Sequence, residues 1–156
     1  MRYHDLSKRL LSATWSPLLG VRVVHSDLPE PWTSALSRLG RDLRVRQYGN
    51  GIEHVDWEID YDPEIDGVFL LSAVTVAGVD PGQFGGSWVG TRVDSDEEFA
   101  LWAMADSVQD VVADLGTAWP WGDDGGFMSA RLVDGVAMWK DRNGCTMRIG
   151  DLVGIV

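Results

Sequence analysis

The sequence predicts an α+β domain with a mainly antiparallel sheet, one long amphipathic helix over residues 95–115 and shorter N-terminal helices. Two observations carry this prediction. Short β-rich segments are separated by glycine-containing turns, and one longer segment has apolar residues at helical spacing. The 156 residues contain 45% hydrophobic and 24% charged side chains, without repeats or a linker. We therefore expect a single domain over residues 1–156.

The N-terminal part is expected to combine helices with an edge strand. Residues 4–14 fit a short helix that ends before Pro17, and the β-branched run 21–24 fits an edge strand. Residues 31–43 fit a second helix. The apolar face of this second helix consists of Trp32, Leu36 and Leu39.

A hairpin is the clearest local prediction. Residues 54–62 alternate, so their apolar side chains face one way and their polar side chains the other. Residues 43–46 alternate in the same manner, and a three-residue turn at 49–51 would place Arg44 opposite Asp56 and Arg46 opposite His54. We therefore expect 43–46 to pair with 54–62.

The middle of the chain predicts a covered strand followed by the main helix. Residues 67–77 are apolar on both faces, which is typical of a central strand covered on both sides, and residues 87–93 fit a further strand. The helix is expected to begin at Ser95, with Glu98 completing a capping box, and to end at Gly116. Its buried stripe consists of Leu101, Ala105, Val108, Val112 and Leu115.

The C-terminal part predicts a three-stranded meander. Its strands are expected at 130–133, 136–140 and 145–149, joined by turns at 134–135 and 142–144.

The charge of the chain is concentrated in its middle. The net charge is −11, but residues 51–128 contain one basic residue, Arg92, against seventeen acidic ones, a net charge of −16. The segments before and after this stretch carry net charges of +4 and +1. An asymmetry of this size indicates an acidic surface with a specific location.

Two sets of carboxylates make up this predicted acidic belt. The strand set is Asp56, Glu58, Asp60 and Asp62, and the helix set is Glu98, Asp106, Asp110 and Asp114. Like charges at i,i+4 cost a few tenths of a kcal/mol each, and acids near the C-terminal end of a helix oppose its dipole.

Two interpretations of the belt stay open. It is either a solvated surface, in part paired internally with Arg38, Arg41, Arg44 and Arg46, or an interface for a basic macromolecule. An immunity-type inhibitor of a toxin or nuclease and a DNA-mimicking factor are concrete forms of the second interpretation. Direct nucleic-acid binding is disfavoured, because phosphate contacts need lysine and arginine.

The glycine-rich loop after Trp119 is a second candidate contact. Trp121 and Phe127 would be exposed anchors flanked by Asp123 and Asp124, since aromatic side chains dominate many interfaces. The alternative is a plain connection with Trp119 in the core.

No motif names a reaction, a metal or a cofactor. His25 near Asp27, His54 beside Asp56 and the single Cys145 are the only catalytic candidates, and none forms a recognised constellation. Residues 62–67 resemble the start of a calcium loop, but Ala73 stands where the bidentate glutamate would be, so a turn is the better interpretation. We expect no catalytic residues, no metal and no cofactor.

The sequence also indicates where the protein works. Residues 1–15 carry Asp5, Lys8 and Arg9 without a signal-like apolar run, and no stretch is long and apolar enough to span a membrane. We therefore expect a cytoplasmic protein without membrane contact.

Five segments of the C-terminal third form a recognisable pattern: Ala105–Asp110, Leu115-Gly116, Trp119-Pro120, Leu132–Trp139 and Ile149–Leu152. This pattern resembles a family of small, uncharacterised proteins from high-GC Gram-positive bacteria. In that family, Trp-Pro-x-Cys-Pro-x-His and Val-Trp-x-Cys-Pro segments supply residues that look like metal ligands. Here Gly122, Asp124–Gly126 and Asp141 stand at those positions, so the resemblance implies a shared scaffold without the metal site.

The expected function is a non-enzymatic acidic protein that binds a basic protein partner, in the manner of an inhibitor or immunity protein. Two alternatives stay open. One is a small-ligand-binding or enzymatic α+β domain, and the other is a structural subunit of a phage-like or secretion assembly.

Overall fold

The computed structural model describes residues 8–79 and 85–154 and confirms an α+β fold with antiparallel sheets. The main sheet has the order β2-β1-β4-β5-β6. Its strands are β1 (Lys8–Ser16), β2 (Gly20–Ser26), β4 (Ile52–Asp62), β5 (Gly67–Val76) and β6 (Gly85–Thr91). The helices are α1 (Glu30–Leu43) and α2 (Glu97–Asp114). Neither described helix combines the length and apolar character that crossing a membrane requires.

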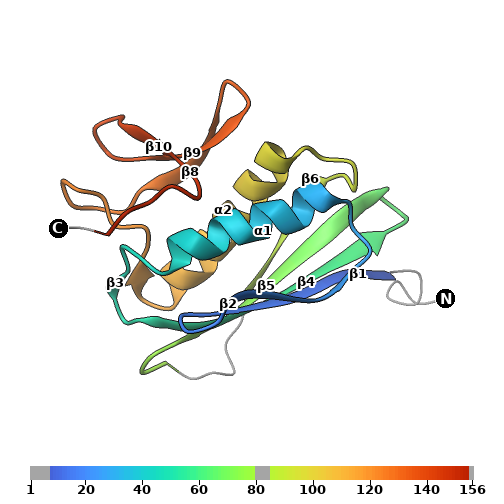
Figure 1. The fold of residues 1–156 in the computed structure, drawn as a ribbon, viewed down its shortest axis with the longest axis horizontal. Helices are drawn as coiled ribbons and strands as arrows, with labels where there is room; N and C mark the ends of the chain where they lie inside the picture. Colours follow the sequence, from blue (N-terminus) through green and yellow to red (C-terminus); the bar gives the residue numbers. More distant parts are fainter. Residues whose placement is uncertain (1–7, 80–84, 155–156) are drawn as a thin grey trace.

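A smaller sheet forms the C-terminal lobe. Its strands are β8 (Ser129–Val133), β9 (Val136–Lys140) and β10 (Thr146–Arg148), in the order β10-β9-β8. The predicted meander is therefore confirmed. β3 (Tyr48–Gly49) and β7 (Thr117–Ala118) form a further short antiparallel pair. β3 precedes β4 of the main sheet in the sequence, and β7 precedes β8 of the lobe. Figure 1 shows the lobe beyond the helices, which lie between it and the main sheet.

The predicted helix at 4–14 is wrong for the residues that the structure describes, because residues 8–16 form β1. From Leu11 to Ser16 buried and half-buried residues alternate, with Leu11, Ala13 and Trp15 buried, which is the period of a strand. β1 lies between β2 and β4, so it pairs with a strand on each edge. The edge strand predicted at 21–24 is confirmed as β2 and the second helix as α1.

The strand at 54–62 is confirmed within β4, but its predicted hairpin partner is wrong. Residues 43–46 do not pair with it, because Leu43 is the last residue of α1 and is fully buried there. β1 and β5 flank β4 instead, and Asp56 lies opposite Thr14 and Ala73. The alternation at 43–46 is thus the end of a helical face and a loop, and the charge match of Arg44 with Asp56 was misleading.

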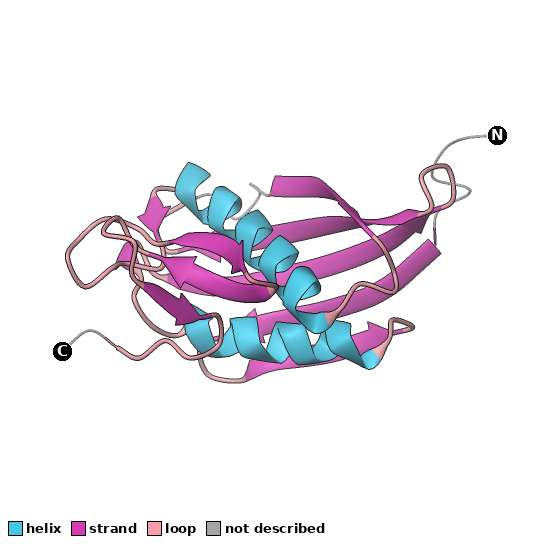
Figure 2. Cartoon of the chain, turned by 90° about the horizontal axis from the view of Figure 1, so that it is seen from above, coloured by secondary structure: helices cyan, strands magenta, loops and turns pink. Residues whose placement is uncertain are grey.

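The apolar sequence of β5 predicted a strand that is covered on both faces. The structure shows that the described helices cover only one face. Both helices lie over one face of the main sheet, and Figure 2 shows them together above the strands. On the opposite face Phe69, Leu71 and Ala73 are only half-buried, and no described helix covers them. The apolar run therefore faces a core on one side and a free sheet surface on the other.

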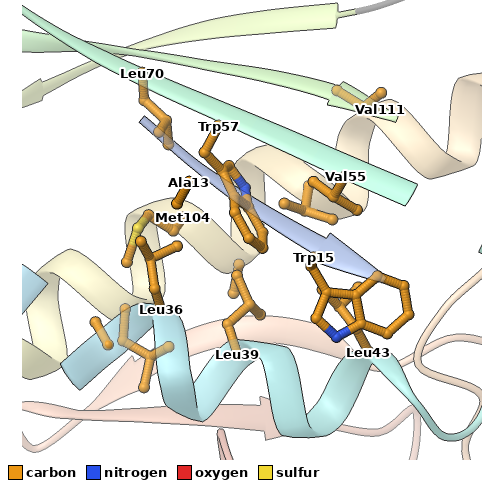
Figure 3. Close-up of a cluster of buried hydrophobic side chains, with 14 of the residues drawn as sticks. Ala13, Trp15, Leu36, Leu39, Leu43, Val55, Trp57, Leu70, Met104 and Val111 are labelled. Atoms are coloured by element: carbon orange, nitrogen blue, oxygen red, sulfur yellow. The ribbon is translucent and has the colours of Figure 1, made fainter. Parts of the chain in front are cut away.

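The core between α1 and the sheet is built from leucines and tryptophans. Figure 3 shows the side chains of α1 facing those of β1 and β4, among them Leu36, Leu39, Leu43, Trp15 and Trp57. Trp15 and Trp57 are at most 1% exposed. Each buried tryptophan removes about 150–250 Å² from water, roughly 4–6 kcal/mol of transfer free energy. This burial fixes α1 on the sheet.

Gly40 permits the close approach of α1 to β2. A Cβ atom at this position would lie 2.3 Å from Val21 Cγ2. The indole of Trp15 donates a hydrogen bond to the Gly40 carbonyl over 3.0 Å. A larger side chain would therefore push the helix away from the strand.

α2 differs from its prediction in its cap and in its exposure. Asp96, not Ser95, caps the helix and accepts a hydrogen bond from the Phe99 amide at 2.8 Å, because Ser95 bonds the Arg92 carbonyl. The predicted buried stripe is confirmed, but most other positions between Ala100 and Val112 are buried as well. α2 packs against β5 on one side and β8 and β9 on the other, so it is not a simple amphipathic surface helix.

Candidate functional site

The exposed side of α2 carries a row of three carboxylates. Asp110 and Asp114 are exposed and Asp106 is half-buried, and the three follow each other at i,i+4 spacing. Within residues 8–79 and 85–154, none of the three forms an ion pair. These three carboxylates therefore keep their charge uncompensated at contact distance.

Asp106 and Asp110 border a groove of about 460 Å³, which we call the acidic groove. It lies between α2, the segment after it and β8, and it brings together residues that the sequence analysis treated as separate signals. Its lining is Asp106, Gln109, Asp110, Ala113, Gly116, Thr117, Ala118, Trp119, Phe127, Ser129 and Arg131. Asp106, Asp110 and Phe127 thus line one groove.

The electrostatics of the groove favour a positive ligand group at Asp106. Burial raises the pKa of Asp106 above its ordinary value, Asp110 raises it further, and Arg131 lowers it. A cation near Asp106 and Asp110 would relieve the repulsion between the two carboxylates. Phe127, which is 58% exposed, offers an aromatic surface at the same groove.

Gln109 holds the walls of the acidic groove together and was missed from the sequence. Its side-chain amide donates to the carbonyls of Trp119, at 3.1 Å, and Met128, and its oxygen accepts from the Ala130 amide at 3.4 Å. One helix residue therefore ties both neighbouring segments to α2. The available signal was a polar residue directly after the buried Val108.

Other members of the glycine-rich loop face away from the groove. Trp121 is half-buried and stacks on Tyr48, with ring centroids 4.1 Å apart. Asp123 pairs with Arg46 at 2.8 Å, and the Asp124 carboxylate accepts a hydrogen bond from Asn143 at 2.6 Å. Of the four predicted loop contacts, only Phe127 lies at the acidic groove.

Glu98 was predicted as part of the helix set of the acidic belt, but it is engaged inside the fold. Glu98 is a partner of Arg38 and accepts a hydrogen bond from the Ala137 amide at 3.0 Å. Burial raises the pKa of Glu98, but the bonds from Arg38 and Ala137 outweigh it, so its pKa is lowered overall. Glu98 therefore joins α1, α2 and β9 inside the fold.

The strand set lies on the free face of the main sheet and is largely engaged there. Arg9 pairs with Asp60 and, at 3.1 Å, with Glu58, while His54 lies 2.7 Å from Asp56. Asp56 and Glu58 border a groove of about 340 Å³ on this face. Because the sheet separates this face from the helices, the two sets do not form one continuous belt.

Asp62 was expected on the exposed strand face, but it is 5% exposed. Its carboxylate accepts a hydrogen bond from the Glu64 amide at 2.9 Å and so closes the turn between β4 and β5. Among the described residues, no group of three or more histidine, cysteine or acidic side chains is arranged to hold a metal ion.

The three catalytic candidates are all peripheral. His25 lies 3.2 Å from Asp27, and His54 lies beside Asp56. Neither histidine lines the acidic groove or the groove on the free sheet face. Cys145 is exposed in a turn.

A buried carboxylate that the sequence did not single out lies at the end of α1. Asp42 is fully buried and accepts hydrogen bonds from Trp139 Nε1 at 2.7 Å, the Gly150 amide at 2.6 Å and the Leu152 amide at 3.1 Å. Burial raises its pKa, although the three donors lower it in part. Asp42 fastens the C-terminal segment to α1 and has a structural role.

The positions that the family resemblance assigns to metal ligands lie close together. A Cβ atom on Gly122 would lie 3.7 Å from the Cβ of Asp141. In this chain, Arg142 and Asn143 bond Asp124 across the same gap. Hydrogen bonds therefore join the two loops of the C-terminal lobe here.

Comparison with known proteins adds no assignment. No family model matches the chain, and neither the curated proteins nor the solved structures contain a significant match.

Proposed function

We propose that this chain is a non-enzymatic binding protein that engages a basic protein partner at the acidic groove. Its most concrete form is a cytoplasmic inhibitor or immunity-type antitoxin. The observation that carries the proposal is the row of Asp106, Asp110 and Asp114, which has no ion-pairing cation among the described residues. A helix selected for stability alone would place lysine or arginine between such acids.

Besides its carboxylates, the groove offers aromatic side chains for the apolar contact of a protein interface. Phe127 exposes an aromatic ring beside the carboxylates, and Trp119 contributes to the floor while being 1% exposed. Carboxylates would steer and orient a basic segment, and an aromatic anchor would supply the apolar contact.

The proposed interface contains fewer residues than the predicted acidic belt and loop contacts. Glu98, Asp62 and Asp123 are engaged within the fold and fall outside it. Asp56, Glu58 and Asp60 lie on the other side of the sheet and have partners of their own, so they serve as a matched control set.

The test compares two variants with the same change in net charge. One combines Asp106→Asn, Asp110→Asn and Asp114→Asn, and the other combines Asp56→Asn, Glu58→Gln and Asp60→Asn. The probe is a labelled oligo-arginine peptide titrated by fluorescence anisotropy. At about 0.5 kcal/mol per exposed pair, the helix variant is expected to bind about tenfold more weakly, and the control close to wild type.

A natural partner is then sought by pull-down from the native lysate at about 50 mM and 500 mM salt, since exposed ion pairs are screened at the higher concentration. One basic protein that wild type retains at low salt, and that the helix variant alone fails to retain, supports the proposal. Equal weakening of both variants would show that only the overall charge matters and would refute the groove as the interface.

A further inference from the structure

Next to the acidic groove lies a second hollow of opposite charge, which we call the basic groove. It has a volume of about 430 Å³ and runs over the outer face of the C-terminal lobe. It is lined by Gly126, Phe127, Ser129, Arg131, Lys140, Asp141 and Arg142. Three cations therefore surround one hollow in a chain whose net charge is −11.

The strand register explains why the cations gather. Ser129 lies opposite Lys140 in the β8–β9 pair, and Arg131 is two residues further along β8. Arg131 and Lys140 consequently share one face as diagonal neighbours, within reach of long side chains. Arg142 follows β9 and extends over Gly126, where a Cβ atom would lie 3.7 Å from its Cδ.

None of the three cations is neutralised at contact distance. Across residues 8–79 and 85–154, no ion pair includes Arg131, Lys140 or Arg142. The one carboxylate in the lining, Asp141, accepts bonds from the amides of Asn143 and Cys145 at 2.9 Å each and is engaged in its own turn. Among the described residues, Arg131 and Arg142 donate to backbone carbonyls, those of Ala130 and Asp124.

Arg131, Lys140 and Arg142 line a single hollow and form no ion pair among the described residues, so together they could hold an external anion. Two guanidinium groups and an ammonium group are the donors that phosphate oxygens accept from, and guanidinium binds them in a bidentate manner. From this geometry we propose that the basic groove binds a phosphate group. This goes beyond the proposed function. Arg131 and Phe127 line both grooves, so the two proposals are distinguished by their probes, inorganic phosphate here and the oligo-arginine peptide there.

The clean variant is Arg131→Gln combined with Lys140→Gln, since neither side chain bonds another loop. Arg142 is left in place because it donates to the Asp124 carbonyl and supports the glycine-rich loop. The matched control is Arg22→Gln combined with Arg148→Gln, two exposed cations outside the lining that give the same change in net charge.

The measurement is a titration of ¹⁵N-labelled protein with inorganic phosphate, with sodium chloride at matched ionic strength as the reference. Wild type is expected to show saturable shifts at the amides of Gly126, Ser129 and Arg131. In the double variant we expect affinity to fall about tenfold, and in the control it should be unchanged, because two direct ligands are lost only in the first. Parallel titrations with phosphoserine and adenosine monophosphate show whether the group is carried by a peptide or by a nucleotide.

If sodium chloride at the same ionic strength produces the same amide shifts, the shifts reflect charge screening, and the proposal of a phosphate site is refuted. Equal loss in the control variant, or shifts centred away from the lobe, would overturn it as well. Peptide binding at the acidic groove is measured separately, so either proposal can fail while the other stands.

Discussion

Replacing Asp42 tests how much of the fold depends on one buried carboxylate. In Asp42→Ala, the indole of Trp139 and the amides of Gly150 and Leu152 lose their common acceptor. Each unsatisfied buried donor costs about 1–3 kcal/mol, and relief of the carboxylate's own desolvation offsets part of this. We expect a net loss of about 3 kcal/mol, which corresponds to a Tm lower by about 6–12 °C for a domain of this size.

The assay is urea and thermal unfolding followed by tryptophan fluorescence, with Asp114→Ala as the control for an exposed carboxylate. The control is expected to stay within about 0.5 kcal/mol of wild type. Loss of less than about 0.5 kcal/mol in Asp42→Ala would refute the argument that these three donors depend on Asp42.

The pH dependence of Asp42 adds an independent check. Because its folded pKa is raised, the folded state binds the proton more tightly than the unfolded chain does. The associated stability is fully present below about pH 4 and is lost as the pH rises through the folded pKa. Asp42→Asn lacks this ionisation, so the stability of wild type relative to Asp42→Asn should decrease over that range; a constant difference would contradict the raised pKa.

Two further predictions concern stability. Gly40→Ala should destabilise the fold by about 1–3 kcal/mol in urea unfolding, because its Cβ would lie 2.3 Å from Val21 Cγ2. Gly154→Ala, with no atom within 4 Å of its Cβ, should have little effect, and equal losses would contradict the tight contact. Glu98 has a lowered pKa, so its contribution should be present above about pH 4.5 and be lost as the pH falls through the folded pKa. Glu98→Gln should flatten the decline of the unfolding free energy between about pH 5 and 3, and an unchanged decline would assign the acid sensitivity to other groups.

Local periodicity was enough to predict several elements. The alternation around Trp57 and Ile59 located β4, and the apolar spacing from Leu101 to Val112 located α2. The pairing of β4 was not predictable in this way. Its neighbour β1 is about 40 residues earlier in the chain, and local charge matching favoured the nearer segment at 43–46. Long-range pairing depends on the burial of whole faces, which no single segment reveals.

The candidate site was predicted in fragments. Asp106, Asp110 and Phe127 were identified separately, and the structure places them at one groove. Glu98 and Asp62 have the same side-chain chemistry as the exposed acids, so only their surroundings show that they are internal partners. Gln109 and Arg131 were missed, because their roles depend on the packing of β8 against α2.

The bonds made by Asp42 also order the events of folding. Its three donors come from residues 97, 108 and 110 positions further along the chain. During synthesis, α1 therefore emerges before the three donors that bond the Asp42 carboxylate at its end. Closing loops of this length carries an entropic cost and slows folding. We therefore expect the C-terminal lobe to dock last, which leaves the Asp42 end of α1 open to water until then.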